Sequence, residues 1–103
     1  MNAYEVIVYR DSRGRSAFAS WYDALDPLAA RKVLDAVLRL EQGNFSDSKR
    51  LQGGVMERRV HSGPGYRIYF GIDGNVIVLL RGGTKRTQSK DIMKAKEHWI
   101  DYT

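Results

Sequence analysis

The chain contains no cysteine and only two prolines among its 103 residues. Without cysteine it can form neither a disulfide nor a thiolate metal site, which fits a reducing compartment. Its apolar runs fall well short of the roughly 20 residues that a helix needs to cross a bilayer. Segment 1–11 has Glu5 and no basic residue ahead of its apolar stretch, unlike a signal peptide. We therefore expect a soluble, cytoplasmic protein.

Residues that could hold a metal or a cofactor are also sparse. The two histidines, His61 and His98, are far apart, and the carboxylates are not clustered at any recognisable ligand spacing. The glycine-rich segments lack the Lys-Ser/Thr pattern of a phosphate-binding loop. No Ser–His–Asp arrangement follows from spacing. We expect no metal and no cofactor, and we interpret His98 as a helix-surface residue.

What the chain does have is enough apolar sequence for one core and an excess of positive charge. The hydrophobic fraction of 43% indicates a folded globule, and the length indicates a single domain, residues 1–103. The formal net charge is +5, and residues 55–103 supply most of it with nine basic and five acidic side chains. Such an excess favours phosphate-rich partners, although many ordinary globular proteins are equally basic.

The first half of the chain predicts one strand and two helices. Residues 3–10 alternate around β-branched and aromatic side chains, which is typical of a strand. A first helix begins after Asp11, Ser12 or Ser16, and a second begins at Asp26-Pro27 and ends near Gly43. Both helices carry apolar stripes at helical spacing, so they predict a hairpin packed on a sheet. Residues 43–54 are expected to form a connection without secondary structure.

The second half predicts three strands and a last helix. Strands are expected at 55–61, 66–72 and 75–82, with the Asp73-Gly74 turn joining the last two. This pairing predicts Arg67 opposite Leu80 and Tyr69 opposite Val78, and Gly82-Gly83 is expected to end the strand. The apolar residues among these positions need a cover, which we expect the C-terminal segment to provide. The predicted fold is α+β, in the order β-α-α-β-β-β-α, with a helical hairpin on a mostly antiparallel sheet.

The cations of residues 57–88 are compatible with RNA cleavage that uses no metal. That reaction needs fixed positive charge around a phosphate, which Arg provides with a bidentate fork, and a group that moves a proton, for which His61 is the candidate. Alternatively, Arg59 and Arg67 are ordinary surface cations paired with Glu57 or Asp73. The alternative interpretation of His61, Lys49, Arg50, Lys85 and Arg86 is that they are solvated or structural.

Short motifs spread from Gly43 to Glu97 resemble the RelE/ParE superfamily of bacterial toxins, in particular the HigB-like subfamily of addiction module killer proteins. They are GNF at 43–45, Glu57 with Arg59, GPGYRIYF at 63–70, GGTK at 82–85, TQ at 87–88 and DI at 91–92. The order of predicted elements also matches. The resemblance implies a RelE-like two-layer fold, and a toxin of a type II toxin–antitoxin module that cuts messenger RNA on the ribosome without a metal.

The resemblance also assigns roles to residues. It puts the central catalytic arginine at Arg67 and assisting cations at Arg59 and at Lys85 or Arg86, with His61 as a candidate acid or base. The tyrosine that RelE carries early in its last helix is missing near Ile92, and Arg58 stands where related sequences have an apolar residue. Further RNA contacts are expected from Tyr69, Arg58, Lys49, Arg50 and Lys90.

The implied partners are messenger RNA, the ribosome and a cognate antitoxin, a small helix-turn-helix protein encoded beside the toxin. Two other functions share this fold: a ParE-type inhibitor of DNA gyrase, and an inactive relic that still binds its antitoxin.

Overall fold

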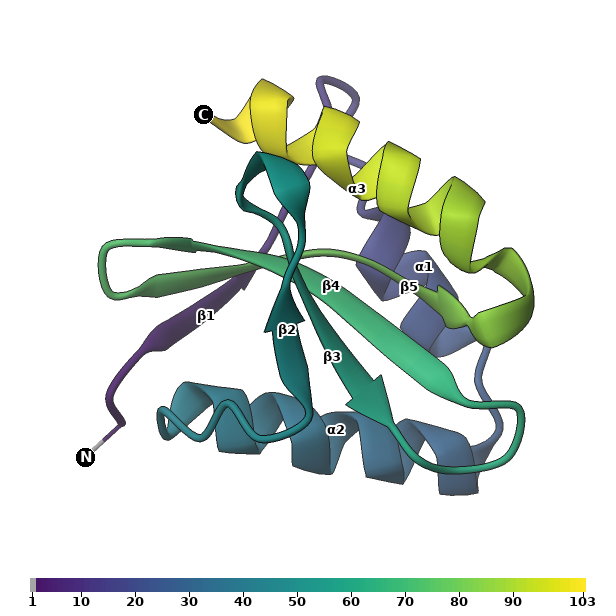
Figure 1. Ribbon diagram of the computed structural model, residues 1–103. Helices are drawn as coiled ribbons and strands as arrows, with labels where there is room; N and C mark the ends of the chain where they lie inside the picture. Colours follow the sequence, from purple (N-terminus) through teal and green to yellow (C-terminus); the bar gives the residue numbers. More distant parts are fainter. Residues whose placement is uncertain (1) are drawn as a thin grey trace.

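The computed structural model describes residues 2–103, so Met1 of the predicted domain lies outside the description. One five-stranded sheet runs through the molecule in the order β1-β5-β4-β3-β2 (Figure 1). Its strands are β1 (Glu5–Val8), β2 (Ser48–Arg50), β3 (Met56–Val60), β4 (Tyr66–Asp73) and β5 (Val76–Thr84). β1 runs parallel to β5, and the other neighbouring strands are antiparallel.

A helical hairpin covers one face of the sheet. Helix α1 (Ala17–Asp23) begins where the Ser16 side chain accepts a hydrogen bond from the Ala19 amide, and α2 (Pro27–Glu41) begins where Asp26 accepts one from Ala29. Both caps lie at predicted starts, with Ser16 chosen among three candidates. The core of this face combines buried side chains of the hairpin with those of β3, β4 and β5: Phe18, Val33, Ala36, Leu40, Val60, Ile68, Phe70, Ile77 and Leu79.

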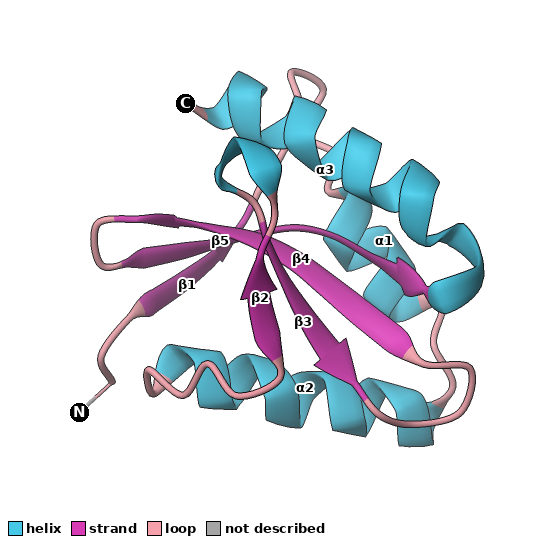
Figure 2. Cartoon of the chain, in the orientation of Figure 1, coloured by secondary structure: helices cyan, strands magenta, loops and turns pink. Residues whose placement is uncertain are grey.

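The C-terminal helix α3 (Gln88–Tyr102) lies across the opposite face of the sheet (Figure 2). Its buried Ala95 packs with apolar residues of β4 and β5 and of the segments beside them, namely Tyr9, Val55, Tyr69, Val78 and Leu80. The expected α+β class, the helical hairpin on the sheet and the C-terminal cover are therefore confirmed. Within residues 2–103, no helix combines the length and the apolar character needed to cross a membrane.

Residues 43–54 and Gly82-Gly83 differ from their predictions. The expected structureless connection contains the short strand β2 and the 3-10 turn η1 (Gln52–Gly54). The two glycines lie inside β5, which continues to Thr84 and the 3-10 turn η2 (Lys85–Thr87). A Cβ at Gly82 would overlap the Trp21 indole, and one at Gly83 would overlap the Asp91 carboxylate. The glycines therefore make room for close packing and do not end the strand.

The predicted pairing of β4 with β5 is wrong by several residues. Arg67 lies opposite Gly83 and Tyr69 opposite Arg81, three positions beyond their predicted partners. Two of these positions come from the turn, which pairs Asp73 with Val76, and the third comes from an irregularity between Tyr69 and Phe70. Such a bulge places an extra residue in one strand and changes which side chains share a face beyond it. Arg81 therefore lies on the α3 face, close to Tyr69 and Arg67.

Candidate active site

A row of polar side chains crosses the sheet beneath the N-terminal half of α3. The strand registers align Lys49 of β2, Glu57 of β3, Tyr69 of β4 and Arg81 of β5. Because directly opposed residues of antiparallel strands lie on one face, all four side chains are on the α3 side. Glu57 is completely buried, which is rare for a carboxylate unless cations or donors surround it.

Glu57 is held by three side chains from three different elements. Its Oε2 accepts a hydrogen bond of 2.8 Å from Gln88 Nε2 at the start of α3, and lies 3.8 Å from Arg67 Nε. Its Oε1 lies 3.7 Å from the Nζ of Lys49, whose side chain is mostly exposed. We call Glu57, Lys49, Arg67 and Gln88 the Glu57 cluster. It joins β2, β3, β4 and α3 around one buried negative charge.

Polar atoms inside this cluster lack partners. Among the described residues, Glu57 Oε1, Arg67 Nε and the Tyr69 hydroxyl are buried without a hydrogen bond. Burial, followed by the neighbouring Glu57 charge, raises the pKa of Tyr69, so its phenol stays protonated. A buried charged cluster with incomplete hydrogen bonding destabilises the fold unless something binds there. Such clusters are typical of functional sites.

The Gly63–Gly65 turn holds Arg67 and brings Lys85 beside it. Arg67 Nη1 donates a hydrogen bond of 2.9 Å to the Gly65 carbonyl oxygen, which also accepts one from the Lys85 backbone amide at 3.0 Å. Gly65 has φ +77°, and a Cβ there would lie 3.3 Å from Arg67 Nη1. A glycine is needed at this position both for its conformation and for the close approach of the guanidinium. Arg59 lies directly opposite Arg67 in the strand register and is exposed.

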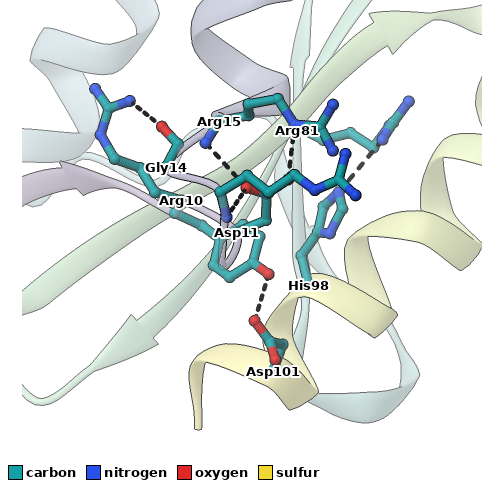
Figure 3. Close-up of polar contacts among 9 residues, drawn as sticks. Arg10, Asp11, Gly14, Arg15, Arg81, His98 and Asp101 are labelled. Atoms are coloured by element: carbon teal, nitrogen blue, oxygen red, sulfur yellow. Dashed lines mark hydrogen bonds and ion pairs between the residues drawn. The ribbon is translucent and has the colours of Figure 1, made fainter.

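A second polar network anchors α3 to the sheet. Arg81 Nε donates a hydrogen bond of 3.0 Å to Asp91, whose other oxygen accepts one from the Thr87 hydroxyl. Arg81 also reaches His98 Nε2 at 3.3 Å, and Figure 3 shows its guanidinium directed at that ring. Thr87 and Asp91 lie on either side of Gln88 in the sequence. This network therefore also holds Gln88, the residue that donates to Glu57, in position.

His98 is half-buried, so its interpretation as a surface residue is wrong. Its ring stacks on Tyr9, with centroids 5.0 Å apart. Burial, and then the nearby Arg81 charge, lower the pKa of His98, which favours a neutral ring that accepts from Arg81. The Tyr9 hydroxyl donates to Asp101, and this hydrogen bond together with burial raises the pKa of Tyr9 to about 12.

His61 and Arg58 belong to a different part of the molecule. Both contact the Asp47 carboxylate, with His61 Nε2 at 3.5 Å and Arg58 Nη1 at 3.4 Å. They line a cavity between α2 and β3, away from the α3 face. His61 is therefore not placed beside Arg67 as expected of its acid or base. Arg58, which stands where related sequences have an apolar residue, is itself buried, with 4% of its side chain exposed.

The other predicted site residues divide between the rim and the interior. Arg59, Lys85, Arg86 and Lys90 are exposed, and Lys90 lines a shallow cavity with Trp21 and Thr87. Arg50 is opposite Met56, at the other end of β3 from Arg59. The expected RNA contact by Tyr69 is wrong, because its side chain is completely buried beneath α3.

Sequence reasoning missed Glu57 and Gln88 as members of the site. The sequence indicated Glu57 only as a residue of a family motif and as a possible surface partner of Arg59 and Arg67. Its burial depends on α3 lying above it, which strand periodicity cannot reveal. The usable signal was a single acidic residue between apolar and basic residues of a strand, together with the TQ pair at 87–88.

Comparisons with known proteins identify a relative and no function. No protein-family model matches the chain. An uncharacterized protein of Haemophilus influenzae is 43% identical over 81 residues, which cover 77% of this chain and 82% of the relative. In the part of the chain that the structure describes, no group of three or more His, Cys, Asp or Glu side chains is arranged to hold a metal ion.

Proposed function

This chain belongs to the same protein family as the Haemophilus influenzae relative, and we propose that it is the toxin of a type II toxin–antitoxin module. Its activity is the cleavage of messenger RNA on the ribosome without a metal ion. The motifs at 63–70, 82–85 and 87–88 support this proposal through their resemblance to RelE-type toxins. In the folded chain the same motifs converge on the Glu57 cluster.

The observation that carries the proposal is the position of Arg67. Its side chain is 11% exposed and is held from one side by the Gly65 carbonyl and from the other by buried Glu57. Exposed Arg59 and Lys85 lie next to it, at the strand position opposite and at the adjoining turn. A partly buried guanidinium with exposed cations beside it is suited to a phosphate group whose charge increases during reaction.

The chemistry that fits this arrangement is internal phosphoryl transfer. The 2′-oxygen of a nucleotide forms a bond to the adjacent phosphorus, its proton leaves, and the bond from phosphorus to the 5′-oxygen breaks as that oxygen gains a proton. Arg67 stabilises the phosphorane that forms between these events, assisted by Arg59 and Lys85 or Arg86. Glu57 acts through Arg67, as a negative charge 3.8 Å from its Nε. The proposal assigns no proton transfer to His61.

The proposal includes a ribosome that presents the message and an antitoxin that silences the enzyme. The antitoxin is expected to be a small helix-turn-helix protein encoded next to this chain. The excess of positive charge in residues 55–103 supports an RNA substrate, because each phosphate that binds releases counterions.

Replacement of Arg67 tests the proposal. We expect Arg67→Ala to reduce cleavage at least about 100-fold, because it removes the charge nearest the phosphorane. Arg67→Lys keeps the charge but loses the fork and is expected to recover only part of the activity. Arg13→Ala, which removes an exposed cation from the loop at 11–15, serves as the control. The measurement is a map of RNA 5′ ends in cells after induction, with circular dichroism to verify each fold.

Three outcomes would contradict the proposal. A folded Arg67→Ala variant that still cuts RNA and stops growth would remove Arg67 from its role. Uncut transcripts accompanied by DNA damage would identify a gyrase inhibitor. Uncut transcripts with normal growth would identify an inactive antitoxin-binding relic.

A further inference from the structure

A second basic site lies on the other side of the sheet from Arg67. A cavity of about 230 Å³ opens between α2 and β3, and Figure 1 shows α2 passing beneath that strand. Five residues with nitrogen-bearing side chains border it, together with two carboxylates, Asp35 and Asp47. The five are Lys32 and Arg39 of α2, Arg58 and Arg59 of β3, and His61.

Arg58 is the unusual member of this group. Its side chain is 4% exposed, and its Nη1 reaches the Asp47 carboxylate at 3.4 Å and the Arg59 carbonyl oxygen at 2.9 Å. Its Nε is buried without a hydrogen-bond partner among the described residues. Burial lowers the pKa of Arg58, with Asp47 offsetting the effect only in part. A guanidinium in this position is incompletely neutralised, and an anion in the cavity would complete its contacts.

Each carboxylate is already paired, Asp35 with a cation outside the cavity and Asp47 with two residues that border it. Asp35 lies 3.4 Å from Arg31 on the outer side of α2, and Asp47 contacts both Arg58 and His61. Lys32 and Arg39 are exposed and lie on the helix face that borders the cavity. The donors therefore approach one space from a helix and from a strand. A tetrahedral phosphate, which accepts hydrogen bonds in several directions, fits this arrangement better than a planar carboxylate.

We propose that this cavity binds a phosphate of the RNA strand, next to the nucleotide whose phosphate lies at Arg67. This inference rests on the proposed function. Arg59 supports it because the residue borders the cavity, where its carbonyl oxygen accepts from Arg58, and its strand position is opposite Arg67. RNA carries a phosphate at every nucleotide, so a strand seated at Arg67 has further phosphates to place. The path from one site to the other passes around the end of β3 at Val60 and His61.

Binding of a short single-stranded RNA as a function of salt tests this subsite. The probe is a mixed-sequence oligonucleotide with 2′-O-methyl groups, which cannot be cut because the attacking hydroxyl is blocked. We expect Lys32→Gln/Arg39→Gln to weaken binding several-fold. The slope of log K against log salt should decrease in magnitude by about 0.7, the value for one phosphate contact on a single strand. Arg13→Gln is the control for loss of a cation elsewhere.

The Arg58 side chain gives a direct readout that needs no substitution in the core. Its Nε–H resonance, observed by ¹⁵N NMR on the whole chain, is expected to shift when the oligonucleotide binds. Inorganic phosphate should produce a smaller shift in the same direction. A shift with inorganic phosphate or with a glutamate-rich peptide, but none with RNA, would overturn the RNA assignment and identify a free anion or an acidic protein as the ligand.

The two proposals can fail separately. One outcome is that Arg67→Ala abolishes cleavage while Lys32→Gln/Arg39→Gln binds RNA with the wild-type slope of log K against log salt. In that case the proposed phosphate subsite is wrong and the proposed nuclease activity stands. If the slope decreases as expected but no RNA is ever cut, the phosphate site stands and the nuclease is wrong. Absence of any RNA binding would overturn both.

Discussion

At the scale of single residues, the proposed site depends on a buried carboxylate more than on a surplus of cations. Glu57 is completely buried, yet it is close to one mostly exposed lysine, one partly buried arginine and one amide. Removing one member of such a buried group leaves the others without their partner. The orientation of Arg67 is therefore expected to depend on the charge of Glu57, and not only on the local strand.

Glu57→Gln should lower activity while preserving shape. The substitution keeps the side-chain volume and one oxygen but removes the charge that faces Arg67 and Lys49. A misplaced catalytic group can cost about 100-fold in rate, so we expect a decrease of that order in kcat with a smaller change in KM. Steady-state cleavage of messenger RNA on ribosomes measures both constants.

The matched control for that experiment is Glu97→Gln, which removes an exposed carboxylate of α3 paired with Lys94. It should leave both constants near the wild-type values. Equal losses in kcat for the two variants would mean that Glu57 contributes no more than an ordinary surface charge.

His98 predicts a stability that depends on pH. Its pKa is lowered in the folded chain, first by burial and then by Arg81. The unfolded chain therefore binds the proton more readily, and its histidines titrate near 6.5. This contribution to stability is complete above that pH and is lost as the pH falls below it toward the folded-state pKa. Urea unfolding at a series of pH values between about 5 and 8 measures the effect.

His98→Gln provides the comparison, because its amide oxygen can still accept a hydrogen bond from Arg81 but does not titrate. We expect the variant to lose less stability than the wild type as the pH decreases from about 6.5 to 5. Parallel curves for the two proteins would show that His98 has no part in the dependence.

The residues of the site were predictable to different degrees. Arg67 could be located because its motif is specific, and Lys85 is near it because the Gly65 carbonyl joins the two segments. His61 was placed wrongly because it follows the end of β3, where strand alternation no longer determines direction, and it contacts Asp47. The C-terminal segment was expected to cover part of the sheet, but which side chains α3 buries there, Tyr69 among them, does not follow from local pattern.

At the scale of elements, helix starts were more predictable than strand pairing. Ser16 and Asp26 cap their helices through side-chain contacts within three residues, so the determining information is local. The register of β4 with β5 depends on a bulge between Tyr69 and Phe70. The turn, which pairs Asp73 with Val76, and this bulge together set the register, and neither follows from strand alternation alone.

The glycines of β5 offer a test of this packing. Gly82→Ala should destabilise the fold by about 1–3 kcal/mol, because its methyl group would overlap the Trp21 indole and overpack the core. Trp21→Ala removes the obstacle at its own cost in stability, so adding Gly82→Ala to it should cost much less than in the wild type. Urea unfolding of the four proteins measures this coupling. Additive effects would mean that the indole does not determine the requirement for glycine.

At the scale of the whole molecule, the sheet separates two polar sites that belong to different faces. The Glu57 cluster lies under α3, and the Arg58 cavity lies against α2. The class of the fold followed from sequence because α2 carries an apolar stripe and the strands supply apolar side chains to both faces of the sheet. The sequence did not predict which cations lie on which face of the sheet. That division depends on where the segment around Asp47 meets the end of β3.

The parallel pairing of β1 with β5 determines when the sheet can be completed. β1 is the first strand to leave the ribosome during synthesis, yet its partner Val76–Leu79 emerges only after residues 9–75. The β4–β5 hairpin closes a short loop and can form quickly, whereas β1 must close a long one. Its apolar Val6–Val8 segment therefore waits unpaired in every nascent chain. A ribosome making this protein holds an incomplete sheet until most of the chain has been translated.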